Sequence, residues 1–271
     1  MLISYSDEIS INVVYPYKSK YNKTIIFIHG FTGSLNDWDD LLPHLDENIL
    51  PITYDLIGHG KSSAPENPQF YSLEFHMEIL KFIIDFFNIK NFGLYGYSLG
   101  GRIALNFAVH NKLEFLIIES STPGIKEEQG REKRYSDDLI LVDFIKNNSI
   151  KSFIKLWMEK DLFKDLKDMP QNKYEKLLSQ KYQNNKIGLI NTLLEFSTGK
   201  MLPIWDKLSN IEYPTLLLSG SEDEKFKGIH KEMSQLLPNS QNIIIKNACH
   251  NLHNTKAETL SQFINAFISN L

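Results

Sequence analysis

Apolar residues along the chain gather in short runs that alternate with amphipathic stretches. Six runs are rich in β-branched and aromatic residues and have the length of buried strands: 24–30, 49–55, 91–97, 113–120, 214–220 and 242–247. Three stretches between them repeat apolar residues at helical spacing: 73–89, 101–109 and 230–238. Because strands separated by helices usually pair in parallel, this order predicts an α/β fold, with a mostly parallel central sheet flanked by helices.

The alternation stops in the middle of the chain. Four helical patterns follow one another there without a credible strand between them: 126–147, 150–167, 171–183 and 187–197. We therefore expect a helical lid, residues 124–205, inserted between a first core segment, 1–123, and a second core segment, 206–271. Residues 3–16 alternate like an edge hairpin, and residues 256–270 have the pattern of a closing helix.

The composition is that of an ordinary globular protein. The chain has 271 residues, 42% of them hydrophobic, and a formal net charge of −4, so nothing favours nucleic acid or an anionic membrane as a partner. Asp7 and Glu8 lie where a signal peptide needs an apolar run, and no apolar stretch reaches the about 20 residues of a membrane span. The single cysteine, Cys249, offers neither an internal disulfide nor a metal-binding pair. We expect a cytoplasmic protein that holds no metal and inserts in no membrane.

The run 91–97 leads into the sequence GYSLG, residues 96–100, at the start of a predicted helix. Gly-x-Ser-x-Gly in this context is typical of a nucleophile elbow, whose glycines let strand and helix cross closely and expose the serine hydroxyl. An anion beside Ser98 would meet the backbone N–H of Leu99 at the helix start. We expect a second donor in the N–H of Phe31, in the loop after the first apolar run. The alternative is a glycine-rich turn with an N-capping serine.

A serine hydroxyl needs a histidine to take its proton and an acid to orient that histidine. The order serine, acid, histidine places the acid after the strand that follows the lid, where Asp223 is the candidate and Glu222 its competitor. The histidine should follow the last strand, and we select His250 over His253 and over His230, which lies within a helical pattern. The alternatives are a solvated acidic loop and a structural histidine.

Arginine is rare in this chain and is concentrated near the elbow and the lid. Only three of the 29 basic residues are arginines, namely Arg102, Arg131 and Arg134. Arg102 lies one helical turn past Ser98, and the other two can share one face of the first lid helix. A guanidinium binds a carboxylate through two parallel hydrogen bonds, which a lysine cannot reproduce. The pattern favours a polyanionic small-molecule substrate, and the alternative is ion pairing with nearby acids such as Asp138.

The order of these motifs resembles the α/β-hydrolase superfamily across nearly the whole chain: the HGF loop at 29–31, the DLIGHGKS loop at 55–62, the elbow, the Asp223 turn and the final histidine. The stretches STPGIKEEQGREKR, GYSLGGR and STGKMLPIW, with Trp157, resemble one menaquinone-pathway family, the 2-succinyl-6-hydroxy-2,4-cyclohexadiene-1-carboxylate (SHCHC) synthases. This resemblance implies a cofactor-free lyase that removes pyruvate from a cyclohexene with three carboxylates. It implies a triad of Ser98, Asp223 and His250. It also implies a substrate pocket formed by Tyr97, Arg102, Arg134, Trp157 and, with a weaker match, Arg131.

Two positions depart from the family pattern. Cys249 replaces the glycine before the final histidine, and Ile57 replaces the proline of the DLPGHG loop, so both changes affect loop shape more than chemistry. We expect the triad serine to act as, or relay to, the base that removes the ring proton α to the succinyl ketone. Tyr97 and Trp157 have the alternative role of core aromatics. The alternatives for the whole protein are a hydrolase of an ester or C–C bond and a non-catalytic binding protein.

Overall fold

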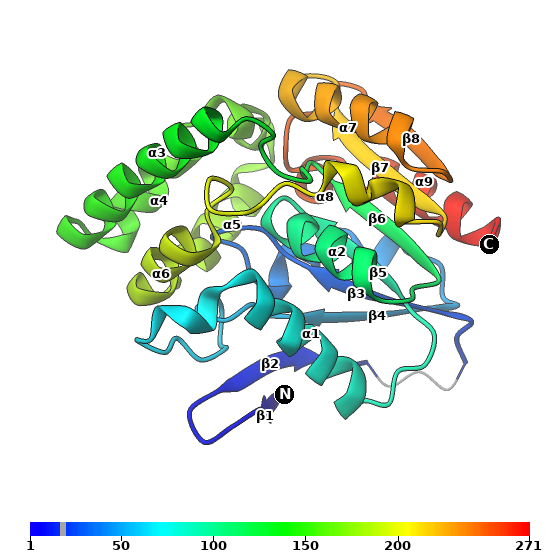
Figure 1. The fold of residues 1–271 in the computed structure, drawn as a ribbon, viewed down its shortest axis with the longest axis horizontal. Coiled ribbons are helices and arrows are strands. Elements are labelled where there is room, and N and C mark those ends of the chain that lie inside the picture. Colours follow the sequence, from blue (N-terminus) through cyan, green and yellow to red (C-terminus); the bar gives the residue numbers. More distant parts are fainter. Residues whose placement is uncertain (17–19) are drawn as a thin grey trace.

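An eight-stranded sheet forms the centre of the computed structural model, which describes residues 1–16 and 20–271 (Figure 1). Its strands are β1 (Leu2–Ser4), β2 (Ser10–Val14), β3 (Lys23–Ile28), β4 (Ile49–Tyr54), β5 (Gly93–Tyr97), β6 (Phe115–Glu119), β7 (Thr215–Gly220) and β8 (Ser240–Ile245). They lie in the order β1-β2-β4-β3-β5-β6-β7-β8. The β1–β2 and β2–β4 pairs are antiparallel, and all the other neighbours are parallel. The predicted α/β fold with a mostly parallel sheet is confirmed.

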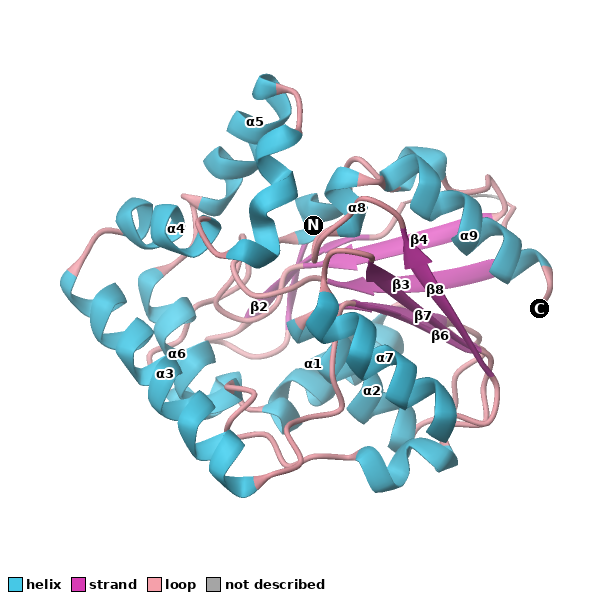
Figure 2. Ribbon diagram, turned by 90° about the horizontal axis from the view of Figure 1, so that it is seen from above, coloured by secondary structure: helices cyan, strands magenta, loops and turns pink. Residues whose placement is uncertain are grey.

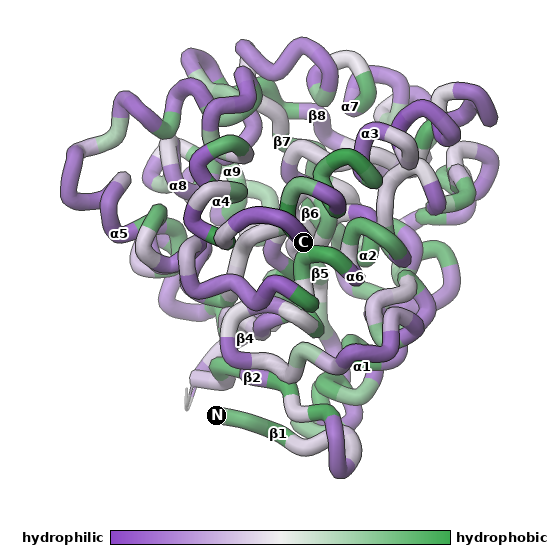
Figure 3. Tube along the Cα trace, turned by 90° about the vertical axis from the view of Figure 1, so that its left-hand side faces the viewer, coloured by the Kyte–Doolittle hydropathy of each residue, from purple (hydrophilic) through white to green (hydrophobic). Residues whose placement is uncertain are grey.

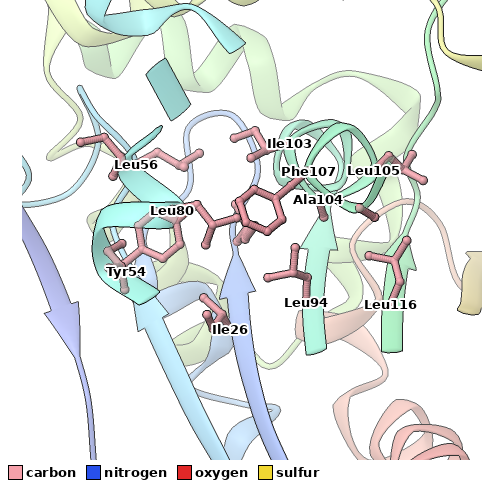
Figure 4. Packing of buried hydrophobic residues seen from close by; sticks show 14 of the residues in the cluster. Ile26, Tyr54, Leu56, Leu80, Leu94, Ile103, Ala104, Leu105, Phe107 and Leu116 are labelled. Atoms are coloured by element: carbon pink, nitrogen blue, oxygen red, sulfur yellow. The ribbon is translucent and has the colours of Figure 1, made fainter. Parts of the chain in front are cut away.

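Helices cover both faces of the sheet (Figure 2). On one face lie α1 (Leu73–Phe86), α2 (Leu99–His110) and α7 (Glu224–Leu236), and on the other lie α8 (Leu252–Thr255) and α9 (Ala257–Ser269). Successive side chains of β3 alternate between the two hydrophobic clusters, with Ile26 and Ile28 in one and Ile25 and Phe27 in the other. Figure 4 shows Ile26 packed in the first cluster beneath the α2 residues. Burial on both faces is the reason why these strands read as continuous apolar runs.

Between β6 and β7 the chain forms a series of helices without a strand, which we call the helical insertion (residues 124–205). It comprises α3 (Glu128–Asn147), α4 (Ile150–Met158), the 3-10 helix η4 (Asp161–Asp168), α5 (Gln171–Lys181) and α6 (Lys186–Phe196). These helices lie together at one side of the sheet and share a small core that includes Phe153, Leu166 and Leu189 (Figure 1). Figure 3 shows hydrophobic stretches along α2 and β6 near the centre of the molecule and hydrophilic ones along α5. No helix of the described residues is both long and apolar enough to cross a membrane.

Two helices differ from the predicted ones. The pattern over 150–167 predicts one helix, but α4 ends at Met158 and η4 follows, because the backbone of Lys160 is extended. After the break, Phe163 packs against the His250 ring, with 6.1 Å between ring centroids. Helix α7 begins at Glu224, well before the predicted 230, because the Asp223 carboxylate caps its first turn by accepting from the N–H of Phe226 at 3.3 Å. Because the first turn of the helix is charged, the apolar pattern of the sequence did not reveal this earlier start.

Candidate active site

The turn between β5 and α2 places Ser98 at the carboxyl end of the sheet. Ser98 has φ 51° and ψ −107°, a conformation that a non-glycine residue rarely adopts. Its N–H donates to the carbonyl of Glu119 at 2.9 Å, and its own carbonyl accepts from the Ser121 hydroxyl at 2.6 Å. A Cβ on Gly100 would lie 2.0 Å from the Ile28 carbonyl oxygen, so the crossing of strand and helix requires glycine there. The sharp turn therefore has the form expected of a nucleophile elbow.

The structure brings Ser98, His250 and Asp223 into one hydrogen-bonded chain. The His250 ring is buried, with Nδ1 2.8 Å from Asp223 Oδ2 and Nε2 3.0 Å from Ser98 Oγ. An ionised carboxylate only accepts hydrogen bonds, so Nδ1 carries the proton and Nε2 accepts from the serine hydroxyl. This is the tautomer in which the imidazole can take a proton from Ser98. Glu222, the alternative acid, instead lies on the surface in an ion pair with Lys164.

Two backbone N–H groups lie at the cavity beside Ser98. The N–H groups of Phe31 and Leu99 donate to no acceptor within residues 1–16 and 20–271, and both residues line the cavity that contains Ser98. Leu99 opens α2, where helical N–H groups have no partner of their own. The loop that carries Phe31 is held from the insertion, since Asn184 Nδ2 donates to the Thr32 carbonyl at 2.9 Å. The pair can stabilise an oxyanion beside the serine.

A cavity of about 400 Å³ opens between the elbow and the helical insertion. Both the core and the insertion contribute to its walls. The core residues include Phe31, Tyr97, Ser98, Leu99, Arg102, Lys225 and His250. The insertion residues include Arg134, Asp138, Trp157, Phe163 and Phe196. The volume suits one small molecule, and Ser98 and His250 lie at its wall.

Arg102 is a buried charge at the wall of this cavity. It is buried (6% exposed), its guanidinium stacks 4.3 Å from the Phe196 ring, and Nη1 donates to the Phe196 carbonyl at 2.9 Å. No carboxylate forms an ion pair with it among the described residues. Burial and the neighbouring charge of Arg134 lower the pKa of Arg102. A desolvated cation held by backbone and ring alone has its remaining N–H groups available for an anionic ligand.

Arg134 is anchored differently. Its Nε donates to both carboxylate oxygens of Asp138, at 3.1 and 3.0 Å, and the Ser197 hydroxyl donates to the same carboxylate at 2.6 Å. No described residue accepts from the terminal nitrogens of this guanidinium. The side chain is therefore fixed at one edge, and its Nη groups remain free at the wall of the cavity.

The structure does not bring Arg131 to this cavity. Its Nη1 donates to the carbonyls of Ile125 and Lys126, at 3.2 and 2.7 Å, so the side chain ties the start of α3 to the preceding loop. Arg131 and Arg134 lie three residues apart on α3, as expected, but only Arg134 lines the cavity. The reason is that free carbonyls before the helix start offer Arg131 a local partner, which helical spacing does not reveal.

The two aromatic candidates both line the cavity. Tyr97 packs with its ring centroid 5.4 Å from that of His250, and burial raises the pKa of its phenol, which stays neutral. Trp157 packs edge-on against Phe31, with 5.3 Å between ring centroids, and its indole N–H donates to no described residue. Both rings shape the wall, as expected of pocket aromatics, while they also belong to hydrophobic clusters.

The other histidines lie away from the serine hydroxyl. His29 ties loop backbone together, with Nδ1 2.8 Å from the Gly30 carbonyl and Nε2 accepting from the Leu56 N–H at 3.0 Å. His230 on α7 contacts the backbone of Ser121, and its pKa is lowered to about 4 by burial. His253 pairs with Glu119 in the core. Among the described residues, no group of three or more histidine, cysteine, aspartate or glutamate side chains could hold a metal ion.

The sequence interpretation missed two features of the site. Lys225, two residues after Asp223, lines the cavity, and it forms no ion pair with the described residues. The sequence places Lys225 close to Asp223, which is a signal for the site. However, the sequence does not show whether a lysine in an acidic stretch points into the cavity or into solvent. The second feature is η4, from which Phe163 packs 6.1 Å from the His250 ring and the Leu162 carbonyl accepts the His250 N–H at 3.2 Å. No local pattern reveals this contact across the chain.

Comparisons with known proteins agree with the fold and place the chain among proteins of similar sequence. The family model of the alpha/beta hydrolase fold matches residues 23–257. A Bacillus subtilis (strain 168) protein with the provisional name 2-succinyl-6-hydroxy-2,4-cyclohexadiene-1-carboxylate synthase is 32% identical over 92% of this chain and 92% of its own length. The synthase of that name from Klebsiella pneumoniae (strain 342) is 29% identical over 84% of this chain and 87% of its own. Among solved structures, MenH from S. aureus has a TM-score of 0.89 and 30% identity, covering 96% of this chain and 98% of that one.

Proposed function

This chain belongs to the α/β-hydrolase family and, within it, to the family of SHCHC synthases, and from that premise we propose that it is a cofactor-independent lyase of menaquinone biosynthesis. The substrate is 2-succinyl-5-enolpyruvyl-6-hydroxy-3-cyclohexene-1-carboxylate, and the products are SHCHC and pyruvate. The observation that carries the proposal on this chain's own residues is Arg102, a buried guanidinium without a carboxylate partner beside the triad. A site for a neutral ester has no need of such a charge, whereas a substrate with three carboxylates does.

The charges at the cavity wall are arranged to bind several carboxylates at once. Arg102 and the free edge of Arg134 offer planar forks, and Lys225 supplies a third cation. Each charge-assisted hydrogen bond to a carboxylate contributes roughly 1.5–3 kcal/mol. Tyr97 and Trp157 enclose the ring of the substrate between them and the triad. Multiple carboxylate contacts fix the ring in one orientation, which is what a regioselective proton removal requires.

The reaction begins at the ring carbon α to the succinyl ketone. As the Ser98 oxygen removes the ring proton, Ser98 Oγ passes its own proton to His250 Nε2, so the step ends with a neutral serine and an imidazolium. The electron pair released from the C–H bond forms a new ring double bond, the existing double bond shifts by one position, and the C–O bond to the enolpyruvyl group breaks. The enolpyruvate takes up a proton to become pyruvate. The N–H groups of Phe31 and Leu99 stabilise the enolate that develops on the ketone, each by about 3 kcal/mol.

The helical insertion acts in this proposal as a lid. It contributes Arg134 and Trp157 to the cavity, and it contacts the histidine loop through Leu162. Substrate carboxylates therefore bridge the insertion and the core, through Arg134 on one side and Arg102 on the other. Closing a site in this way excludes water, which strengthens the charge interactions inside.

A fluorophosphonate probe is expected to label Ser98, while the natural substrate leaves no acyl-enzyme. The labelling follows from the hydrogen bond between Ser98 and His250, which activates the hydroxyl whatever the substrate. Proton abstraction requires no covalent intermediate. Stopped-flow measurement of pyruvate, combined with mass spectrometry of quenched enzyme, checks both halves. A pyruvate burst together with a substrate-derived adduct on Ser98 would instead indicate a hydrolase-type mechanism.

A further inference from the structure

A fully buried carboxylate lies directly behind the triad. Glu119, the last residue of β6, and His253, three residues past His250, both have side chains that are 0% exposed. A carboxylate in this environment is destabilising unless its oxygens accept hydrogen bonds. Oε1 accepts from the Leu252 N–H at 2.7 Å, from the His253 N–H at 3.3 Å and from His253 Nδ1 at 2.9 Å. Oε2 accepts from the Tyr95 hydroxyl at 2.6 Å and lies 3.0 Å from His253 Nδ1.

Glu119 also bonds to the segment that carries the triad serine. The carbonyl of Glu119 accepts the N–H of Ser98 at 2.9 Å, across the parallel β5–β6 pair in which Tyr97 and Glu119 are in register. The Tyr97 ring packs against both histidines, 5.4 Å from His250 and 4.5 Å from His253 by ring centroids. Glu119 therefore bonds to the backbone of the serine with its main chain and to the backbone after the histidine with its side chain.

The histidine loop is fixed from two directions. From the helical insertion, Asp165 Oδ2 accepts the Cys249 N–H at 2.8 Å and the Leu162 carbonyl accepts the His250 N–H at 3.2 Å. From the core, only the Glu119 carboxylate receives the N–H groups of residues 252 and 253 within the described chain. Without it, the core holds the loop only at and before the histidine, where the Ala248 carbonyl accepts the Glu222 N–H at 3.0 Å and Asp223 accepts from the His250 ring.

We propose that Glu119 is a positioning residue, which sets the separation of Ser98 Oγ and His250 Nε2 by hydrogen-bonding to the backbone of both segments. The proposal deepens the proposed function, since it rests on the same triad. A misplacement of about 1 Å at a reacting pair can lower the rate by about 100-fold. In this proposal the separation depends on whether the acceptor reaches the N–H groups of residues 252 and 253, more than on its negative charge.

Two substitutions separate reach from charge. In Glu119→Gln the amide oxygen keeps the position of Oε1 and the charge is lost, while the Tyr95 hydroxyl can rotate to accept from the new NH₂ group. In Glu119→Asp the charge remains, but the carboxylate withdraws from the Leu252 N–H by one methylene. Tyr95→Phe is the matched control, because it removes a hydrogen bond to the same buried carboxylate without touching the backbone of either triad segment.

The measurement is the second-order rate at which a neutral fluorophosphonate labels Ser98, with the melting temperature of each variant determined beside it. We expect Glu119→Asp to label about 10- to 100-fold more slowly than wild type. Glu119→Gln should stay within about five-fold of wild type and Tyr95→Phe within about two-fold. Equal labelling rates for Glu119→Asp and wild type, or for Glu119→Asp and Tyr95→Phe at equal melting temperature, would overturn the proposal. The probe is independent of the lyase substrate, so the result stands whether or not pyruvate is released.

Hydrogen exchange covers the case in which Glu119→Asp does not fold. A neutral amide is a weaker acceptor than a carboxylate, so Glu119→Gln should raise exchange in segment 249–253. Tyr95→Phe should leave that segment unchanged. Equal exchange in the two variants would show that Glu119 contributes only to core integrity and would overturn the proposal.

Discussion

Ser98→Ala and His250→Ala are each expected to lower kcat for pyruvate release by about a thousand-fold or more, and the double variant should lose little beyond either one. The reason is the single chain of hydrogen bonds through Ser98 Oγ, His250 Nε2 and Nδ1 and Asp223 Oδ2. A base that has lost its partner cannot relay the proton, so the second deletion removes an interaction that is already absent. Steady-state rates of the two single variants and the double variant check this result.

Ser219→Ala is the matched control for the serine. Its hydroxyl is fully buried on β7 without a hydrogen-bond partner in the described structure, and the residue does not line the cavity. We expect wild-type turnover from this variant. Losses that add up in the double variant, so that each residue acts independently of the other, would contradict the proposed triad.

Arg134→Lys is expected to lower kcat/KM about 10- to 150-fold, although the charge is kept. Arg134 uses Nε for Asp138 and keeps its terminal nitrogens for the substrate, whereas a lysine has one nitrogen for both partners. Because the ion pair with Asp138 is partly exposed, its contribution to stability is small, and the melting temperature should change little. Steady-state kinetics and thermal unfolding of the variant check the two expectations.

Lys133→Arg serves as the control on the same helix. The Lys133 side chain is 80% exposed and does not line the cavity, so its exchange should leave the kinetics unchanged. Labelling of Ser98 by the neutral fluorophosphonate should also be unchanged in Arg134→Lys, since that probe carries no carboxylate. A wild-type kcat/KM in Arg134→Lys would show that the guanidinium does not bind substrate.

The strands and the order of the site residues can be predicted from the sequence because their signals are local. A strand buried on both faces reads as a run such as TIIFIHG, and its packing on both sides is observed for Ile25 to Ile28. Because these strands are parallel, the loops that follow them all lie at the same end of the sheet, where the strands have their carboxyl ends. That constraint places the elbow serine, the acid and the final histidine near one another before any distance is known.

Contacts that depend on side-chain direction could not be predicted in this way. Helical spacing puts Arg131 and Arg134 on one face, but nearby carbonyls capture Arg131. The break at Lys160 and the charged start of α7 interrupt an apolar pattern without a proline or glycine to mark the change. Glu119 appears in the sequence only as the end of an apolar strand, and its donors come from residues far along the chain.

The most direct test of the proposed lyase is pyruvate release from the enolpyruvyl-succinyl cyclohexene substrate by the wild-type protein. Lactate dehydrogenase with NADH follows the pyruvate, and ultraviolet absorbance follows the conjugated diene of SHCHC. A neutral p-nitrophenyl ester is assayed in parallel, with Ser98→Ala as the inactive reference. We predict that pyruvate and diene appear in equal amounts, far faster than without enzyme, and that Ser98→Ala forms neither at a comparable rate. Rapid cleavage of the ester with no pyruvate above the uncatalysed rate would contradict the lyase assignment and favour a hydrolase.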